Sequence, residues 1–224
     1  MERHVVVIYA HPDDESFGAA GTIMKFRKQN VPVTYLCGTL GQMGRNMGPT
    51  KFANRETLAK VRKQELYDAG RFLDIDIRLL GYHDKTIEFE DRQEVAEHIK
   101  TILEEIEPSL VITHYPGYAI HPDHNALGAA TIEAVRLMDE NKRPTLWAQA
   151  IEMNYQDDLG EPDIIHDITD NFDKKLQSIF QHKSQAEGMM KKLSGDLHIA
   201  EEEKERLLQR LGKEQFFIWD FDQE

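Results

Sequence analysis

The chain of 224 residues lacks most of the features that mark secreted or membrane proteins. Its single cysteine, Cys37, has no partner for a disulfide within the chain, so nothing indicates an oxidising compartment. No apolar run approaches the roughly eighteen residues that a transmembrane helix needs. The opening Met-Glu-Arg-His runs directly into a short apolar stretch, without the plan of a signal peptide. The sequence therefore predicts a cytoplasmic protein with no membrane partner.

Positive charge is also scarce, because 27 lysines and arginines face 40 aspartates and glutamates, for a net charge of −13. A nucleic-acid-binding surface needs basic residues against phosphates, so the balance argues against a nucleic-acid partner. Apolar residues make up 40% and charged residues 30% of the chain, which is typical of a globular protein. We expect a single domain over residues 1–224, of which about 171–224 form a C-terminal helical part.

Two nucleotide-binding motifs are missing. No Gly-x-Gly-x-x-Gly follows the first predicted strand, which argues against a dinucleotide-dependent dehydrogenase. The glycine-rich segment 38–48 is not followed by Gly-Lys-Ser or Gly-Lys-Thr, so it is no phosphate cradle. We expect this segment to form a rim or lid over a binding site.

Short β-branched runs alternate with longer stretches of helical periodicity. The runs predict strands over residues 5–9, 33–37, 75–80, 110–113 and 146–153. The periodic stretches predict helices over residues 22–29, 54–73, 95–106, 123–139, 171–193 and 197–211. Repeated strand–helix–strand units predict a Rossmann-like α/β fold, a mostly parallel sheet with helices on both faces and a C-terminal helical extension. The aromatic cluster 216–219 is expected either to pack on the core or to form a contact between subunits.

The first predicted strand is followed at once by His11-Pro12-Asp13-Asp14-Glu15. Turn formation and helix capping explain one of these aspartates, or two. They do not explain a histidine beside three consecutive acids, whose carboxylates repel one another. A bound cation would relieve that repulsion, so the segment favours a metal or catalytic site over a plain turn.

A second polar segment, His121-Pro122-Asp123-His124, follows the fourth predicted strand. In open parallel sheets, ligands bind beyond the carboxyl ends of the strands, so the two segments can meet there. Two imidazoles and one carboxylate form a three-ligand set with an open fourth position, as in catalytic zinc sites. Imidazoles favour zinc over magnesium, and Fe²⁺ uses the same ligand set.

Both segments resemble the two signature motifs of the PIG-L/LmbE zinc-dependent de-N-acetylases. Residues 181–185, Gln-His-Lys-Ser-Gln, are similar to a later family element of the form His-x-Ser-Gln. The loop 40–48 and the segment 54–56 resemble the bacillithiol-pathway branch, whose enzymes deacetylate N-acetylglucosaminyl malate. The resemblance implies a hydrolase with a small-molecule amino-sugar substrate. It leaves the oligomeric state open, although relatives are often trimers or hexamers and a homo-oligomer is one of the alternatives.

The resemblance also assigns roles to three residues of the first motif and to one of the second. His11, Asp14 and His124 match the zinc ligands of the family. Asp13 matches the general base that takes a proton from the metal-bound water. These roles suit the chemistry, because zinc lowers the pKa of bound water to about 7 and a neighbouring carboxylate can accept its remaining proton.

Further residues match family positions that act on the substrate. His121 matches the side chain that stabilises the oxyanion or protonates the leaving amine, and whether His121 or Asp13 delivers that proton is open. Asp123 is expected either to hydrogen-bond His121 and favour its charged form or to cap the following helix. Arg62 matches a substrate-binding arginine, and Arg45 lies in the predicted rim; either suits an anionic malate group.

Two other functions stay open at this point. The same fold and metal could act on another N-acetylated sugar, or the chain could be a metal-binding module without catalysis, which would leave Asp13 and His121 without a purpose. The roles of three residues are also open. His114 could lie behind the metal ligands or in the core, His182 could approach the site or fix the C-terminal helix, and Tyr118 is offset from the family's tyrosine position.

Overall fold

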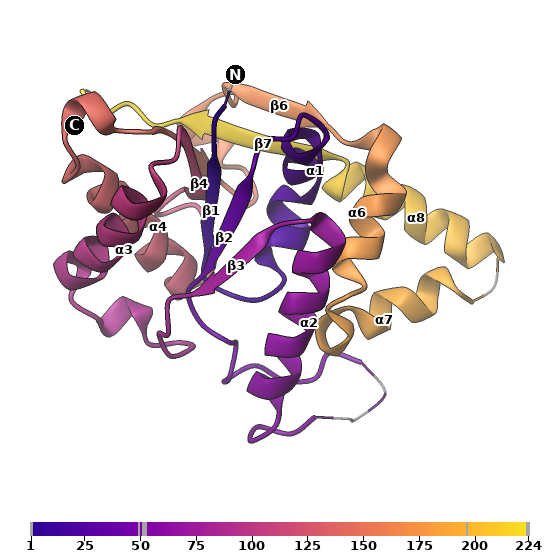
Figure 1. Ribbon diagram of the computed structural model, residues 1–224. Helices are drawn as coiled ribbons and strands as arrows, with labels where there is room; N and C mark the ends of the chain where they lie inside the picture. The colour runs from indigo at the N-terminus through magenta and orange to yellow at the C-terminus, as the bar shows by residue number, and fades with distance from the viewer. Residues whose placement is uncertain (1, 49, 51–52, 196, 223–224) are drawn as a thin grey trace.

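Within residues 2–48, 50, 53–195 and 197–222, which the computed structural model describes, seven strands form one sheet in the order β3-β2-β1-β4-β5-β7-β6 (Figure 1). The strands are β1 (Val5–Tyr9), β2 (Val33–Cys37), β3 (Asp76–Leu79), β4 (Leu110–His114), β5 (Thr145–Gln149), β6 (Ile164–Asp167) and β7 (Lys213–Ile218). The first five strands are parallel, whereas β7 runs antiparallel to both of its neighbours. The prediction of a mostly parallel sheet is therefore confirmed.

Eight helices of the described residues flank this sheet. They are α1 (Ala20–Lys28), α2 (Leu58–Leu73), α3 (Arg92–Ile106), α4 (Pro122–Arg136), α5 (Gln156–Leu159), α6 (Phe172–Ile179), α7 (Lys183–Leu193) and α8 (Leu197–Leu211). Helices α3 and α4 cover one face, and α1 and α2 cover the other, with α6 packed on α1 and α2 (Figure 1). None of the described helices combines the length and the apolar character needed to cross a membrane.

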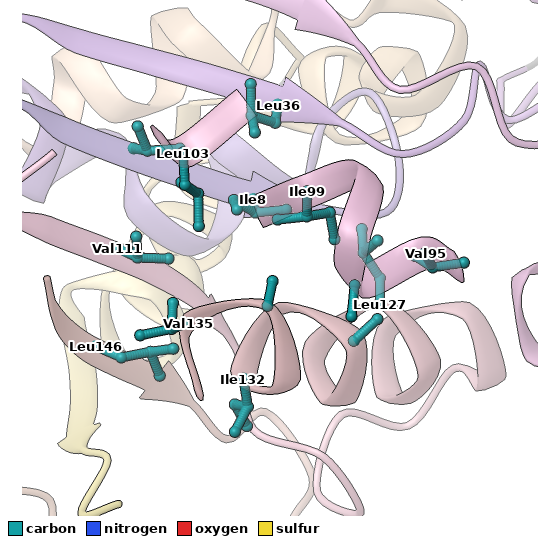
Figure 2. Packing of buried hydrophobic residues seen from close by; sticks show 14 of the residues in the cluster. Ile8, Leu36, Val95, Ile99, Leu103, Val111, Leu127, Ile132, Val135 and Leu146 are labelled. Atoms are coloured by element: carbon teal, nitrogen blue, oxygen red, sulfur yellow. The ribbon is translucent and has the colours of Figure 1, made fainter. Parts of the chain in front are cut away.

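Each central strand contributes side chains to both faces of the sheet. Figure 2 shows the core on the α3 and α4 side, where Ile8 and Val111 of the sheet meet Ile99 and Leu127 of the helices. The alternate residues of β1 point to the α1 and α2 side, where they join a second core cluster. Because β1 is buried on both faces, its sequence is continuously apolar rather than alternating.

Two strand predictions need correction. The strand expected over 146–153 ends at Gln149, and the four-residue edge strand β6 was not predicted, because its half-exposed sequence is short and contains His166 and Asp167. The aromatic cluster belongs to β7 and not to a helical tail. Of the two roles left open for the cluster, its Phe216 and Phe217 pack in the core, 0% and 8% exposed.

The helix predicted over 171–193 is broken into α6 and α7 by Phe180–His182. At the break, His182 is fully buried, and its Nε2 lies 2.6 Å from Oε1 of Glu15 near the other end of the chain. A buried polar ring needs a hydrogen-bond partner, and the partner here is distant in sequence. The break therefore depends on tertiary structure, which helical periodicity does not report.

A second buried ion pair ties the C-terminal strand to the rest of the fold. Glu214 of β7 accepts a hydrogen bond from Nζ of Lys175 at 2.7 Å, and both side chains are 1% exposed. The same carboxylate accepts the backbone N–H groups of Gly21 and Thr22 in the first turn of α1. It therefore satisfies helix donors that have no partner inside the helix.

We expect Lys175→Met to lower the free energy of unfolding by about 3–5 kcal/mol, because it leaves a buried carboxylate without its cation. Lys174→Met is the matched control, since Lys174 is an exposed lysine of the same helix. Urea denaturation of both variants measures the difference. Equal unfolding midpoints for the two variants would show that the pair contributes no net stability.

Candidate active site

The two polar motifs meet at the carboxyl ends of β1 and β4, which pair in parallel. His11 follows β1, and His124 lies in the first turn of α4, directly after the loop that leaves β4. Nδ1 of His11 and Nε2 of His124 are 3.0 Å apart, although 113 residues separate them in the sequence. The convergence expected from the strand order is therefore present.

Asp14 completes a group of three possible ligand atoms. Its Oδ2 lies 3.6 Å from Nδ1 of His11 and 3.2 Å from Nε2 of His124. Metal–ligand bonds of about 2.0–2.2 Å in tetrahedral geometry place ligand atoms roughly 3.3–3.6 Å apart. The three separations of 3.0, 3.2 and 3.6 Å lie at or slightly below this range, so small shifts of the side chains would let the three atoms hold one divalent ion. His11, Asp84 and His121 form a second possible group that shares His11 with the first.

The outer nitrogen of each histidine in the first group contacts an oxygen acceptor. Nδ1 of His124 lies 3.1 Å from the carbonyl oxygen of Ala119. Nε2 of His11 lies 3.2 Å from Oδ1 of Asp84 and 3.3 Å from Oδ2 of Asp123. Donation to these oxygens leaves the lone pairs of the inner nitrogens free, which is how metal-bound histidines are oriented. The first group therefore fits a metal better than the second.

The charges around His11 stabilise a cation. Burial alone would lower the pKa of His11, but the carboxylates of Asp123, Asp14 and Asp84 raise it well above its usual value. Burial alone would raise the pKa of Asp14, but His124 and its neighbouring imidazoles hold it well below its usual range. A divalent ion would supply the positive charge for which this group of residues is arranged.

Asp13 lies beside the ligand group and has an unusual backbone conformation, with φ of +107°. Its Oδ2 is 3.3 Å from Nη2 of Arg62. Burial raises the pKa of the Asp13 carboxyl to about 6, with Arg62 opposing and Asp14 adding to the shift. Arg62 is itself buried, and its guanidinium also donates to the carbonyl oxygens of Pro12 and Gly41. A carboxylate that can exchange a proton thus adjoins the candidate metal site.

Glu15 contacts the backbone of Asp13, and His182 contacts Glu15. The backbone N–H of Asp13 donates to Oε2 of Glu15 at 3.0 Å, and His182 contacts the other oxygen of the same carboxylate. Burial alone would lower the pKa of His182, but the Glu15 carboxylate raises it above its usual value. Two roles were left open for His182, to approach the site or to fix the C-terminal helix. The structure places it against Glu15 in the loop of the site, and this contact also ties the C-terminal helices to that loop.

Ser184 of the same His-x-Ser-Gln element anchors α7 to α2. Its backbone N–H and its hydroxyl both donate to the buried carboxylate of Glu65, at 2.7 and 2.6 Å. Because Glu65 lies one turn after Arg62, the element fixes the helix that carries the arginine beside Asp13. The His-x-Ser-Gln element is therefore in direct contact with the helix that carries Arg62.

Asp123 takes neither of the two roles expected of it, a hydrogen bond to the ring of His121 or the capping of the following helix. Its carboxylate accepts the backbone N–H groups of Lys85 and Ile87 and faces His11, rather than bonding the ring of His121. His121 instead caps α4, because its Nδ1 accepts the backbone N–H of Asp123 at 3.1 Å. Burial lowers the pKa of His121, and the neighbouring His11 lowers it further.

Three other candidate residues lie at different distances from the cluster. The ring of His114 stacks on that of His124 with centroids 4.1 Å apart, and burial lowers the pKa of His114 to about 4. The hydroxyl of Tyr118 instead donates to Asp158 at 3.3 Å. The side chain of Arg45 is exposed on the rim 38–48.

Sequence reasoning missed Asp84, which is 3% exposed and contacts His11. Its other oxygen accepts the backbone N–H of Met43 at 2.8 Å and so connects the rim 38–48 to the site. A signal was present, because Gly81-Tyr82-His83-Asp84 follows the third parallel strand as the two motifs follow the first and fourth. The strand-end rule applied to β3 would have found it.

Comparison with known proteins agrees with this geometry. The family model described as GlcNAc-PI de-N-acetylase (PIG-L) matches residues 6–135. A probable N-acetyl-alpha-D-glucosaminyl L-malate deacetylase 2 from Bacillus cereus is 49% identical over 99% of this chain and 100% of the relative. A protein of the same name from Bacillus subtilis is 48% identical over 88% of this chain and 90% of the relative.

A solved structure is similar over nearly the whole chain. The N,N'-diacetylchitobiose deacetylase from Pyrococcus horikoshii, complexed with an inhibitor, superposes with a TM-score of 0.74 at 26% identity. The match covers 97% of this chain and 84% of that one. With the family model and two relatives near one-half identity, these matches show that the chain belongs to the PIG-L family of de-N-acetylases.

Proposed function

We propose that this N-deacetylase hydrolyses the acetamide of N-acetylglucosaminyl malate in bacillithiol biosynthesis and releases acetate and glucosaminyl malate. One observation carries the chemistry, namely that His11, Asp14 and His124 converge with Asp13 beside them. The malate aglycone is proposed from the names of the relatives that are 44–49% identical to this chain. A cytoplasmic location stays a prediction of the sequence, which leaves the oligomeric state open.

We assign zinc to the His11, Asp14 and His124 group, because two imidazoles and one carboxylate suit it, although Fe²⁺ accepts the same donors. When bound, such an ion supplies a water of lowered pKa and polarises the amide carbonyl. The Asp13 carboxylate would accept one proton from the attacking water. Arg62 holds the Asp13 carboxylate in place at 3.3 Å, and its contact with the substrate stays a prediction of the sequence.

His121 acts on the other side of the reaction. Its Nδ1 accepts the backbone N–H of Asp123, so a neutral His121 carries its proton on Nε2. This N–H donates a hydrogen bond to the developing oxyanion, and the leaving amine takes the proton that Asp13 has removed from the water, because a neutral His121 that gave up its only ring proton would become an imidazolate. Asp123 acts through His11, whose ring it orients. Arg45 on the rim is a contact for the sugar or its aglycone.

The substrate assignment is tested by acetate release from N-acetylglucosaminyl malate, methyl N-acetylglucosaminide and diacetylchitobiose. We expect the malate glycoside to have the highest kcat/KM. A ranking indifferent to the malate would refute the aglycone and leave the deacetylase intact. Absence of acetate from all three would refute an N-acetylglucosaminide substrate altogether.

Metal removal tests the ligand set. We expect chelator dialysis to abolish acetate release and added Zn²⁺ to restore it, because no other group of the site can activate water equally. By elemental analysis, His124→Ala should lose the single bound equivalent, whereas His98→Ala, which replaces an exposed histidine on α3, should keep it. Full activity after chelation would rule out a metal-dependent reaction.

Replacement of Asp13 tests the general base. We expect Asp13→Asn to lower kcat by about 10²–10⁴-fold, since an amide cannot accept the proton. Its metal content should match that of the wild type, which separates a base from a ligand. Asp157→Asn is the control, because Asp157 is exposed and lies outside the cluster. Unchanged kcat in Asp13→Asn would exclude this residue as the base.

A further inference from the structure

A cavity of about 340 Å³ opens beside the candidate metal site. Asp14 and His114 form part of its wall, so a substrate held at the ligand group can extend into it. The volume lies at the lower end of the range for small-molecule sites. It is far larger than an acetyl group requires, so a larger part of a substrate can occupy it.

Two cations line this cavity, Arg210 at the end of α8 and Lys213 at the start of β7. Both side chains are exposed, and among the described residues neither has a carboxylate within 4.0 Å. Asp167 lies opposite Lys213 in the β6–β7 pair, but the two do not form an ion pair. On the same helix, Arg206 is paired with Glu203 at 2.7 Å. The cavity therefore presents two basic groups that are free to bind an anion.

The wall of the cavity contains a buried imidazole that lacks a hydrogen bond. His114 is 3% exposed, and its Nε2 lies 3.7 Å from Oδ2 of Asp14, beyond hydrogen-bond distance. Neither ring nitrogen has a hydrogen-bond partner among the residues that the structure describes. A buried polar atom of this kind is costly unless a water or a ligand satisfies it. An oxygen of a bound molecule in the cavity would do so.

The charge of the surroundings indicates which molecule needs these cations. The protein carries a net charge of −13, and Asp13, Asp14, Asp84 and Asp123 gather near the reacting atoms. A substrate with carboxylates is repelled there unless basic groups offset the field. The guanidinium of Arg62 is already engaged by protein oxygens, whereas the two cationic groups of the cavity are not. A neutral sugar would need no such compensation.

We propose that Arg210 and Lys213 bind the carboxylates of the substrate's anionic aglycone in this cavity, and that they determine selectivity for acidic glycosides. The inference rests on the proposed function, because it takes the N-acetylated sugar of the substrate as the group held beside His11, Asp14 and His124. Charge-assisted hydrogen bonds from a guanidinium and an ammonium give the recognition.

The test compares the double variant Arg210→Gln/Lys213→Gln with the wild type, both loaded with metal. We measure the ratio of kcat/KM for N-acetylglucosaminyl malate to that for methyl N-acetylglucosaminide. The ratio should fall at least tenfold, mainly through KM of the malate glycoside. Arg206→Gln, an exposed arginine of α8 outside the cavity, should keep the wild-type ratio. An unchanged ratio in the double variant would overturn the proposal.

A binding measurement separates this inference from the proposed function. Succinate, a dicarboxylate of the same carbon count as malate, is titrated into each protein by calorimetry. Weaker succinate binding in the double variant than in Arg206→Gln supports the inference even if neither glycoside is deacetylated. The absence of deacetylation would refute only the proposed substrate. Equal succinate binding in the double variant and in Arg206→Gln overturns the inference. The inference is also overturned if the double variant changes product inhibition by acetate without changing the selectivity ratio.

Discussion

The chemistry of this protein depends on the parallel pairing of β1 with β4. Val5 lies opposite Leu110 and Ile8 opposite Thr113, so both strands end at the same edge of the sheet. Helix α4 then comes unusually close to the end of β4, because a Cβ at Gly128 would lie 2.5 Å from the carbonyl oxygen of His114. A shift of one residue in this register would turn every side chain of the strand to the other face and separate the two motifs.

This arrangement concentrates negative charge where water has little access. Asp14, Asp84 and Asp123 each place an oxygen within 3.6 Å of a ring nitrogen of His11. Buried carboxylates are costly unless they are paired and hydrogen-bonded. Backbone N–H groups and imidazoles satisfy part of this need, and a divalent ion would satisfy the rest. Metal binding at this cluster would therefore be coupled to the stability of these loops, since the candidate ligands come together only in the folded chain.

The sequence predicted those features that depend on local pattern. Continuous β-branched runs predicted β1 and β2. The rule that ligands bind beyond the carboxyl ends of parallel strands predicted that His11 and His124 lie close together. Features set by contacts between distant segments were missed or misjudged. The break between α6 and α7 depends on a pair of residues 167 positions apart, and the direction of the Asp123 carboxylate depends on backbone donors of the loop after β3. Neither leaves a periodic trace in the sequence.

The C-terminal helices belong to the catalytic unit rather than to a separate extension. A non-glycine residue with the backbone conformation of Asp13 costs about 1–3 kcal/mol and persists only if its surroundings fix it. Glu15 accepts its backbone N–H, and His182 in turn fixes Glu15 through a fully buried contact. The family model ends at residue 135, yet the side chain that completes this support lies after α6. The strained backbone at Asp13, the proposed general base, therefore requires the part of the fold that the family model does not cover.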